Sequence, residues 1–436
     1  MIQVLGNSWA LLLGIMFLMV GNGIQGTLLG IRGGIEGFST FEMSIVMSSY
    51  FVGFLFGSRL APELIRRVGH VRVFAALCSF ISAVLILYPT LTDPIAWSAL
   101  RLFVGFCFSG VYVTAESWLN NQATNETRGT SLALYLIVQM IGVIAAQGLV
   151  AVGDPSGFIL FILPSVLVSI SFAPILLSIS PTPAFDTARR MTLRDLFRNS
   201  PLGAVGMILV GGANAAVFGM AGVYGTEAGL PVSQLSLFVA MFYVGGLVLQ
   251  VPIGFVSDRV DRRLVIIGAA AVAIAASLAG WLLPQFVLLL TAAFFIGGML
   301  GPLYGLLIAH TNDFLDNEDM ASGAAGLMFL NGIGAIAGPL AVGWIMGPLG
   351  SQGFFVVLAV LCTAVMLYGL WRTTRRPSVP VDETASYAPV FSQTSPVAME
   401  LATEYYADAL EEVAEANEAE AAEPDTEDTH ASSTMR

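Results

Sequence analysis

The chain has 436 residues, of which 56% are hydrophobic and only 11% are charged. Its mean hydropathy is +0.80, a value that a water-soluble domain cannot carry on its surface. These figures exclude a soluble enzyme, and we expect no nucleic-acid partner. The composition indicates an integral membrane protein whose first partner is the lipid bilayer.

Apolar stretches of about 20 residues, enough to cross a hydrocarbon core of about 30 Å, follow one another along the whole chain. The first six lie near residues 8–30, 41–62, 71–91, 95–118, 130–152 and 157–179. A second six lie near residues 201–224, 234–256, 263–283, 286–309, 322–346 and 353–371. We therefore expect an all-α membrane protein with a six-helix bundle over 1–180, a central loop over 181–200, a second bundle over 201–376 and a tail over 377–436.

The two sets of six are related to each other. A shift of 192 residues superposes residues of the same type at the same places in the hydropathy pattern, namely Asn22 on Asn214, Ser44 on Ser236, Gly53 on Gly245, Arg67 on Arg259, Gly105 on Gly297, Tyr112 on Tyr304, Asn120 on Asn312 and Gly142 on Gly334. Repeated helical bundles around a shared cleft are typical of secondary transporters. The repeat predicts two pseudo-symmetric bundles and solute transport by alternating access.

Charge predicts the orientation of the chain. All 18 basic residues are arginines, and those between the spans lie almost entirely in loops on one side of a twelve-helix arrangement. By the positive-inside rule that side is cytoplasmic, so we expect both termini in the cytoplasm and a location in the plasma (inner) membrane. The tail from residue 377 carries 14 acidic residues and one basic residue, which is typical of a solvated disordered segment or of a binding segment for a soluble partner.

Cofactor chemistry has no sequence support. Cys78, Cys107 and Cys362 fall in separate predicted spans, and the histidines lack metal-ligand spacing, so no metal site is expected. A phosphate-cradling glycine loop is missing from the sequence, so active transport must draw on a gradient. The polar residues of the spans are dispersed, which argues against a membrane-embedded enzyme.

Residues 254–263 read GFVSDRVDRR. This segment resembles the signature loop of the major facilitator superfamily, G-x-x-x-D-R-x-G-R-R, with Asp261 in place of the second glycine. In that family the loop is cytoplasmic, and its charged residues engage helix ends to lock the outward-facing state. The first-half copy is degraded and keeps Arg67. The resemblance implies a cytoplasmic gate, to which the ends of the fourth and fifth spans would contribute, formed by Arg67, Glu116, Arg128, Gly254, Asp258, Arg259, Arg262 and Arg263.

The fourth span carries a second resemblance. Arg101 and Gly105, followed by Glu116 and by Arg128 with its adjacent glycine, are similar to the family's R-x-x-x-G element and to its acidic and Arg-Gly pair. The resemblance implies a role for Arg101 in proton or substrate coupling. A guanidinium within a span needs a wet cavity or a partner, so the alternative is that Arg101 braces neighbouring helices.

Polar residues within the spans are the candidates for a substrate cavity: Asn22, Gln25, Arg101, Tyr112, Gln139, Asn214, Tyr304 and Asn331. Interhelical hydrogen bonds are the alternative explanation for each of them. The candidates for proton coupling are Arg32, Glu36, Arg101 and Glu227. Arg32 and Glu36 are four residues apart and could instead pair with each other.

The segments around TLLGIRGGIEGFST and ESWLN resemble the YcaD-like bacterial branch of the superfamily. We therefore expect a monomeric secondary active transporter of a small solute, coupled to protons. The direction of transport stays open. The alternatives are drug-type efflux of lipophilic compounds, and a transport-like membrane sensor that signals through the acidic tail.

Overall fold

The computed structural model describes residues 2–122, 127–174, 191–283 and 285–375, together with Val379, Pro380, Thr384 and Tyr387. Every regular element in these ranges is a helix. The first half consists of α1 (Ile2–Ile35), α2 (Thr40–Val68), α3 (His70–Leu87), α4 (Pro94–Gln122), α5 (Arg128–Val152) and α6 (Ile159–Ser171). The rest of the predicted tail and the predicted central loop up to residue 190 lie outside the described residues.

The second half repeats this pattern after a short helix, α8 (Leu193–Asn199), within the predicted central loop. It consists of α9 (Pro201–Glu227), α10 (Val232–Ser257), α11 (Arg262–Leu282), α12 (Phe286–Asn312), α13 (Asn317–Leu349), the 3-10 turn η1 (Gly350–Gln352) and α14 (Gly353–Thr373). Ten described stretches are long and apolar enough to cross a membrane, and one of them, Asp319–Thr373, includes both α13 and α14. With the shorter apolar helix α6, the twelve predicted spans correspond to α1–α6 and α9–α14.

Local sequence explains where some of these helices begin and end. Ser39 and Glu42 form a capping box that starts α2, because each side chain accepts a hydrogen bond from the backbone N–H of the other residue. Gly69 separates α2 from α3 with a φ of 87°, a backbone conformation that glycine adopts without strain.

Glycines set the distance between repeat-equivalent helices. A Cβ atom at Gly53 of α2 would lie 1.8 Å from the carbonyl oxygen of Leu102 on α4. A Cβ atom at the repeat-equivalent Gly245 of α10 would lie 1.9 Å from the carbonyl oxygen of Phe294 on α12. Both helix pairs therefore pack backbone against backbone, which only glycine permits. The same kind of contact brings Gly334 of α13 against α9, where its Cβ atom would lie 1.9 Å from the Ile208 oxygen.

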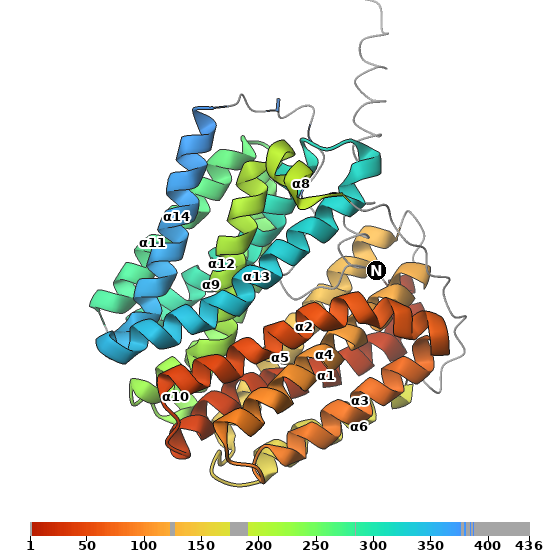
Figure 1. Ribbon diagram of the computed structural model, residues 1–436, viewed down its shortest axis with the longest axis vertical. Coiled ribbons are helices and arrows are strands. Elements are labelled where there is room, and N and C mark those ends of the chain that lie inside the picture. Colours follow the sequence, from red (N-terminus) through yellow and green to blue (C-terminus); the bar gives the residue numbers. More distant parts are fainter. Residues whose placement is uncertain are drawn as a thin grey trace, which may run out of the picture.

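The two bundles meet at one end and diverge at the other (Figure 1). Their contacts join α1 to α9, α2 to α13 and α5 to α10. The backbones of α1 and α9 approach closely near the ends of these helices, where a Cβ atom at Gly30 would lie 2.8 Å from the backbone of Gly222. We call this the closed end. The divergent end contains α8 and the α2–α3 and α10–α11 junctions, and we call it the arginine-rich end.

Candidate substrate cavity and gates

A cavity of about 80 Å³ lies between the two bundles. Helices from both halves line it with Met19, Gln139, Met140, Val143, Asn214, Val217, Phe218, Phe242, Tyr243, Gly246, Gly297, Leu300 and Gly301. This volume has room for several water molecules. Of the predicted cavity residues, Gln139 and Asn214 line it. Asn214 Nδ2 donates to the Leu300 carbonyl oxygen at 3.4 Å, whereas Gln139 Nε2 is buried without a hydrogen-bond partner among the described residues.

Four other predicted cavity residues lie inside the amino-terminal bundle instead. Asn22 Nδ2 donates to the Tyr112 hydroxyl at 3.3 Å, and Gln25 Nε2 donates to the Tyr88 hydroxyl at 3.3 Å. All of these side chains are buried. Asn22, Gln25 and Tyr112 therefore join α1 to its neighbouring helices, which is the interhelical role that the sequence left open.

Arg101 is the fourth predicted cavity residue inside the amino-terminal bundle, and its side chain is completely buried. Its guanidinium carbon lies 4.8 Å from the centre of the Tyr50 ring, and Nη2 lies 3.5 Å from the Met47 sulfur. Among the described residues, no hydrogen-bond partner exists for Nε or Nη1. A charged group in this position has lost its hydration and has gained only a cation–π contact and a weak sulfur acceptor.

The remaining predicted cavity residues belong to the second half. Asn331 lines a smaller cavity of about 20 Å³ between α2 and α13, which Tyr50 also lines. The Tyr50 ring therefore stands between this cavity and Arg101. Tyr304 is fully buried within α12.

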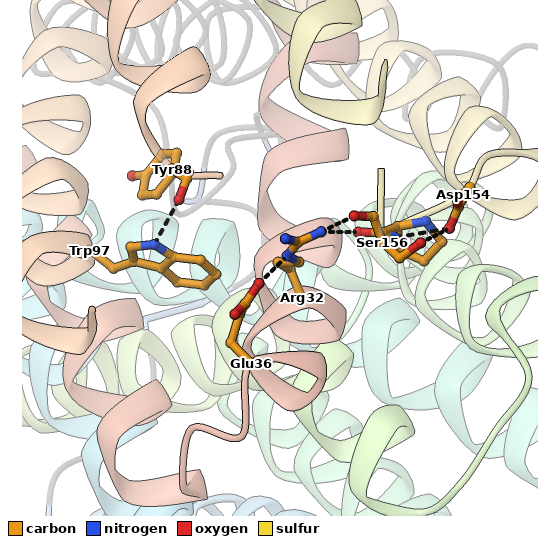
Figure 2. A network of polar contacts seen from close by, with 7 residues as sticks. Arg32, Glu36, Tyr88, Trp97, Asp154 and Ser156 are labelled. Carbon is orange, nitrogen blue, oxygen red and sulfur yellow. Dashed lines mark hydrogen bonds and ion pairs between the residues drawn. The ribbon is translucent and has the colours of Figure 1, made fainter. Parts of the chain in front are cut away.

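The coupling candidates lie toward the closed end. Arg32 Nε lies 2.7 Å from Glu36 Oε1, so these two residues form an ion pair within α1 and its end (Figure 2). Arg32 Nη1 also donates to the carbonyl oxygens of Pro155 and Ser156, in the turn between α5 and α6. That turn is ordered by Asp154, which accepts hydrogen bonds from the Ser156 hydroxyl at 2.6 Å and backbone N–H at 2.9 Å.

These hydrogen bonds from Ser156 hold the pKa of the Asp154 carboxyl below its usual value, so the turn keeps its charge. Arg32 thus joins α1 to the turn beside α6 at the closed end. Glu227, the last residue of α9, is exposed there.

Most of the charged residues of the predicted gate whose side chains are described have partners within their own halves. In the signature loop, Arg262 pairs with Asp313, which follows α12, and both side chains are almost fully buried, at 3% and 5% exposure. Arg263 pairs with Asp261 at 2.8 Å, and the Arg259 guanidinium lies over the Phe255 ring.

Asp258 has a partner from far along the chain. Its Oδ1 atom accepts a hydrogen bond from the backbone N–H of Tyr387 at 2.7 Å, and the Tyr387 ring lies against Gly254. Neither Asp313 nor Tyr387 was predicted from the sequence. Asp313 directly follows Asn312, which matches Asn120 in the sequence repeat. This match is the one sequence signal that could have drawn attention to the position.

In the first half, Arg67 and Arg66 each lie 2.7 Å from Glu63 on the exposed side of α2. Glu116 is completely buried and accepts a hydrogen bond from the Tyr135 hydroxyl at 2.8 Å. Arg128 begins α5, and its side chain lies outside the described residues, so the predicted pairing with Glu116 stays a prediction.

The sequence matches a known family along most of its length. The family model described as Major Facilitator Superfamily matches residues 11–239 and 204–406. The chain belongs to the major facilitator superfamily. This family assigns to it the transport of small solutes across a membrane, as a multi-pass membrane protein.

Its relatives agree with this family and with the predicted branch. The uncharacterized MFS-type transporter YcaD of Escherichia fergusonii is 26% identical over 382 residues, which are 85% of this chain and 97% of that protein. An uncharacterized MFS-type transporter of Enterobacter sp. (strain 638) is 24% identical over 84% of this chain and 96% of that protein.

Solved structures agree with the fold. The nucleoside transporter NupG matches with a TM-score of 0.73 at 16% identity, over 84% of this chain and 99% of that one. A bacterial homolog of the human lysosomal transporter Spinster, in an inward-facing and unoccupied conformation, matches with a TM-score of 0.65 at 14% identity, over 92% and 97%. The twelve-helix architecture in two bundles is therefore the fold of this transporter family.

Proposed function

We propose that this chain is a secondary active transporter that moves a small anionic or zwitterionic solute by alternating access. In this proposal the arginine-rich end is cytoplasmic, both termini are cytoplasmic, and the membrane is the bacterial inner membrane. The conformation described above is then open toward the cytoplasm. Support comes from the divergence of the two bundles at the arginine-rich end and from their tight backbone contacts at the closed end.

The proposed substrate class rests on the environment of Arg101. A buried guanidinium with two nitrogen atoms, Nε and Nη1, that find no partner among the described residues is unfavourable unless an anion can reach it during the transport cycle. The Tyr50 ring that separates Arg101 from the cavity between α2 and α13 would have to rotate or move with its helix to admit that anion. A carboxylate suits the site, because the planar guanidinium can donate two parallel hydrogen bonds to it.

Proton coupling belongs to the same proposal, and Glu36 is its best-supported site. Its carboxylate pairs with Arg32, which also binds the α5–α6 turn, so a proton on Glu36 would weaken a contact network at the closed end. This network lies within the first bundle, but it holds the end of α1, whose Gly30 packs against Gly222 of α9, so its weakening would also loosen the contact between the bundles. Glu227 is exposed at the end of α9, and within the part of the chain that the structure describes it forms no ion pair of this kind.

Drug-type efflux is the second candidate, and the central cavity favours it. Its lining is mostly apolar and aromatic, with Met19, Phe218, Phe242 and Tyr243 among its residues. Such a surface would accept a lipophilic compound without any part played by Arg101.

A thermal-shift screen separates the two candidates. The detergent-purified chain is heated with metabolite carboxylates, amino acids, sugars or lipophilic cations, because a ligand that binds only the folded state raises its melting temperature. Arg101→Ala and Arg101→Met are tested in parallel. Arg198→Ala is the matched control, since it removes one charge from an exposed arginine of α8.

We expect carboxylates to stabilise the wild-type chain and Arg198→Ala, and to lose that effect in both Arg101 variants. A ligand at one hundred times its dissociation constant stabilises by about 2.7 kcal/mol, which such a screen resolves. Stabilisation by lipophilic cations that survives the loss of Arg101 would instead favour drug-type efflux and leave Arg101 as a helix brace.

A further inference from the structure

One residue beyond the last helix is packed into the second bundle. Tyr387 lies at the arginine-rich end between α10 and α12, and its side chain is partly buried against the hydrophobic core. A Cβ atom at Gly254 would lie 2.6 Å from its Cδ1 atom, and a Cβ atom at Gly305 would lie 2.7 Å from its hydroxyl oxygen. Two glycines on facing helices thus form a slot that this ring fills, and no larger residue would leave room for it.

The slot belongs to the same helix faces as the central cavity. On α10, Gly246 and Gly254 are eight residues apart, and on α12, Gly301 and Gly305 are four residues apart. Residues at such intervals lie near one another on one side of a helix. Gly246 and Gly301 line the central cavity, so Tyr387 lies on the continuation of that surface, roughly 6–12 Å closer to the arginine-rich end at 1.5 Å per residue.

Other contacts tie the same part of the chain to the signature loop. The backbone N–H of Tyr387 donates to the Asp258 carboxylate of the signature loop at 2.7 Å. Val379 and Thr384 border a small pocket together with Asp261, Arg262 and Asp313. Three described residues after α14 therefore lie beside the loop or the helix ends next to it.

We propose that Tyr387, held by Asp258, is an autoinhibitory plug in the solute path between the central cavity and the arginine-rich end. While the ring occupies the Gly254–Gly305 slot, a solute in the cavity cannot leave or enter at that end. The hydrogen bond from the backbone N–H of Tyr387 to Asp258 holds the plug in place. Because the plug belongs to the same chain, its effective concentration is high, and a modest contact energy keeps the slot occupied.

The experiment measures access to the cavity. A cysteine is placed at Val217, which lines the cavity, and its reaction rate with a bulky maleimide is followed by mass spectrometry in the full-length chain. The three native cysteines are buried, and the chain without the Val217→Cys change gives their background rate. The Tyr387→Ala variant removes the plug. The Gly305→Ala variant adds one methyl group whose three nearest neighbours are all atoms of Tyr387, so it expels the ring and leaves the helices in place.

We expect both variants to raise the labelling rate of Val217→Cys about tenfold. This ratio corresponds to a change of about 1.4 kcal/mol in the free energy with which Tyr387 occupies the slot. Gly268→Ala, at a helical glycine with open space around it, and Tyr405→Ala, in the tail, should leave the rate unchanged. Equal rates in all variants would overturn the plug. The proposal rests on a solute path that opens at the arginine-rich end, so an unreactive Val217→Cys in every variant would overturn that path as well. Neither result depends on which solute is transported.

Discussion

At the scale of single residues, the chain buries two arginines in opposite ways. Arg262 faces Asp313 in a pair that solvent barely reaches, whereas Arg101 has an aromatic ring and a sulfur atom as neighbours. A buried ion pair holds its charges by mutual attraction, but a buried single charge keeps most of its desolvation penalty. The first arrangement is a structural lock within the second bundle, and the second is the arrangement that a ligand can complete.

The lock leads to a prediction about stability. Asp313→Asn leaves the Arg262 guanidinium without its counter-charge, which should lower the free energy of unfolding by about 3–5 kcal/mol. Thermal melting of the purified variant in detergent measures this loss. Asp195→Asn is the matched control, because Asp195 pairs with Arg198 at 3.8 Å on an exposed helix, and such pairs contribute about 0–1 kcal/mol. Equal melting temperatures for the two variants would contradict the buried lock.

At the scale of helices, the two halves pack one pair of helices in the same way, through glycines. Gly53 and Gly105 bring α2 and α4 together, and Gly245 and Gly297 do the same for α10 and α12 at positions 192 residues later. In lipid there is little hydrophobic drive between helices, so their association depends on close van der Waals contact. The same helix contacts therefore recur 192 residues apart, which explains why glycines stand at matching positions in the two halves.

Gly53→Ala tests this packing. Its methyl group would lie 1.8 Å from the Leu102 oxygen, so α2 and α4 must separate. We expect this separation to lower the free energy of unfolding by about 1–3 kcal/mol. We expect the melting temperature to fall by several degrees. Gly268→Ala on α11 is the control, because no atom lies within 4 Å of the added methyl group. A Gly53→Ala variant as stable as Gly268→Ala would show that the helices are not held at this distance.

At the scale of the whole molecule, two rigid bundles share contacts at one end. Thr27 donates to Gln147 at 2.9 Å within the first bundle, while Gly30 and Gly34 of α1 face Gly222 and Thr226 of α9 across the interface. Alternating access requires that the contacts across the interface separate and that those within a bundle persist.

A crosslink measures that requirement. A Cβ atom at Gly34 would lie 3.7 Å from the Cβ atom of Thr226, within the range of disulfides. The double variant Gly34→Cys and Thr226→Cys should therefore crosslink on oxidation and hold the closed end shut. With a protease site in the loop before α8, the two halves would stay joined on a non-reducing gel, and transport would stop until a reductant is added.

Each single variant is the control for that crosslink, since neither can form it. Transport that continues in the oxidised double variant would contradict a cycle in which the closed end opens.

Much of the candidate site lay beyond prediction from the sequence. The four-residue spacing of Arg32 and Glu36 allowed their ion pair, because neighbours on one helix are fixed by local geometry. The contact of Asp258 with Tyr387 joins residues 129 positions apart, and no periodicity in the chain relates them. Likewise, the predicted polar residues divided between the central cavity and the interior of the first bundle according to the rotation of each helix, which the bundle packing sets.

By itself, the sequence determined the twelve apolar helices and their division into two related halves, because length, hydropathy and repeat register are properties of the chain alone. Only the tertiary structure decided which end of the bundles is closed. It also decided that Arg101 has no counter-charge among the described residues, and that Tyr387 fills a slot on the arginine-rich side of the cavity. Those outcomes depend on backbones that approach within a few ångströms after folding. Such distances follow from the packing of all the helices together rather than from any one segment.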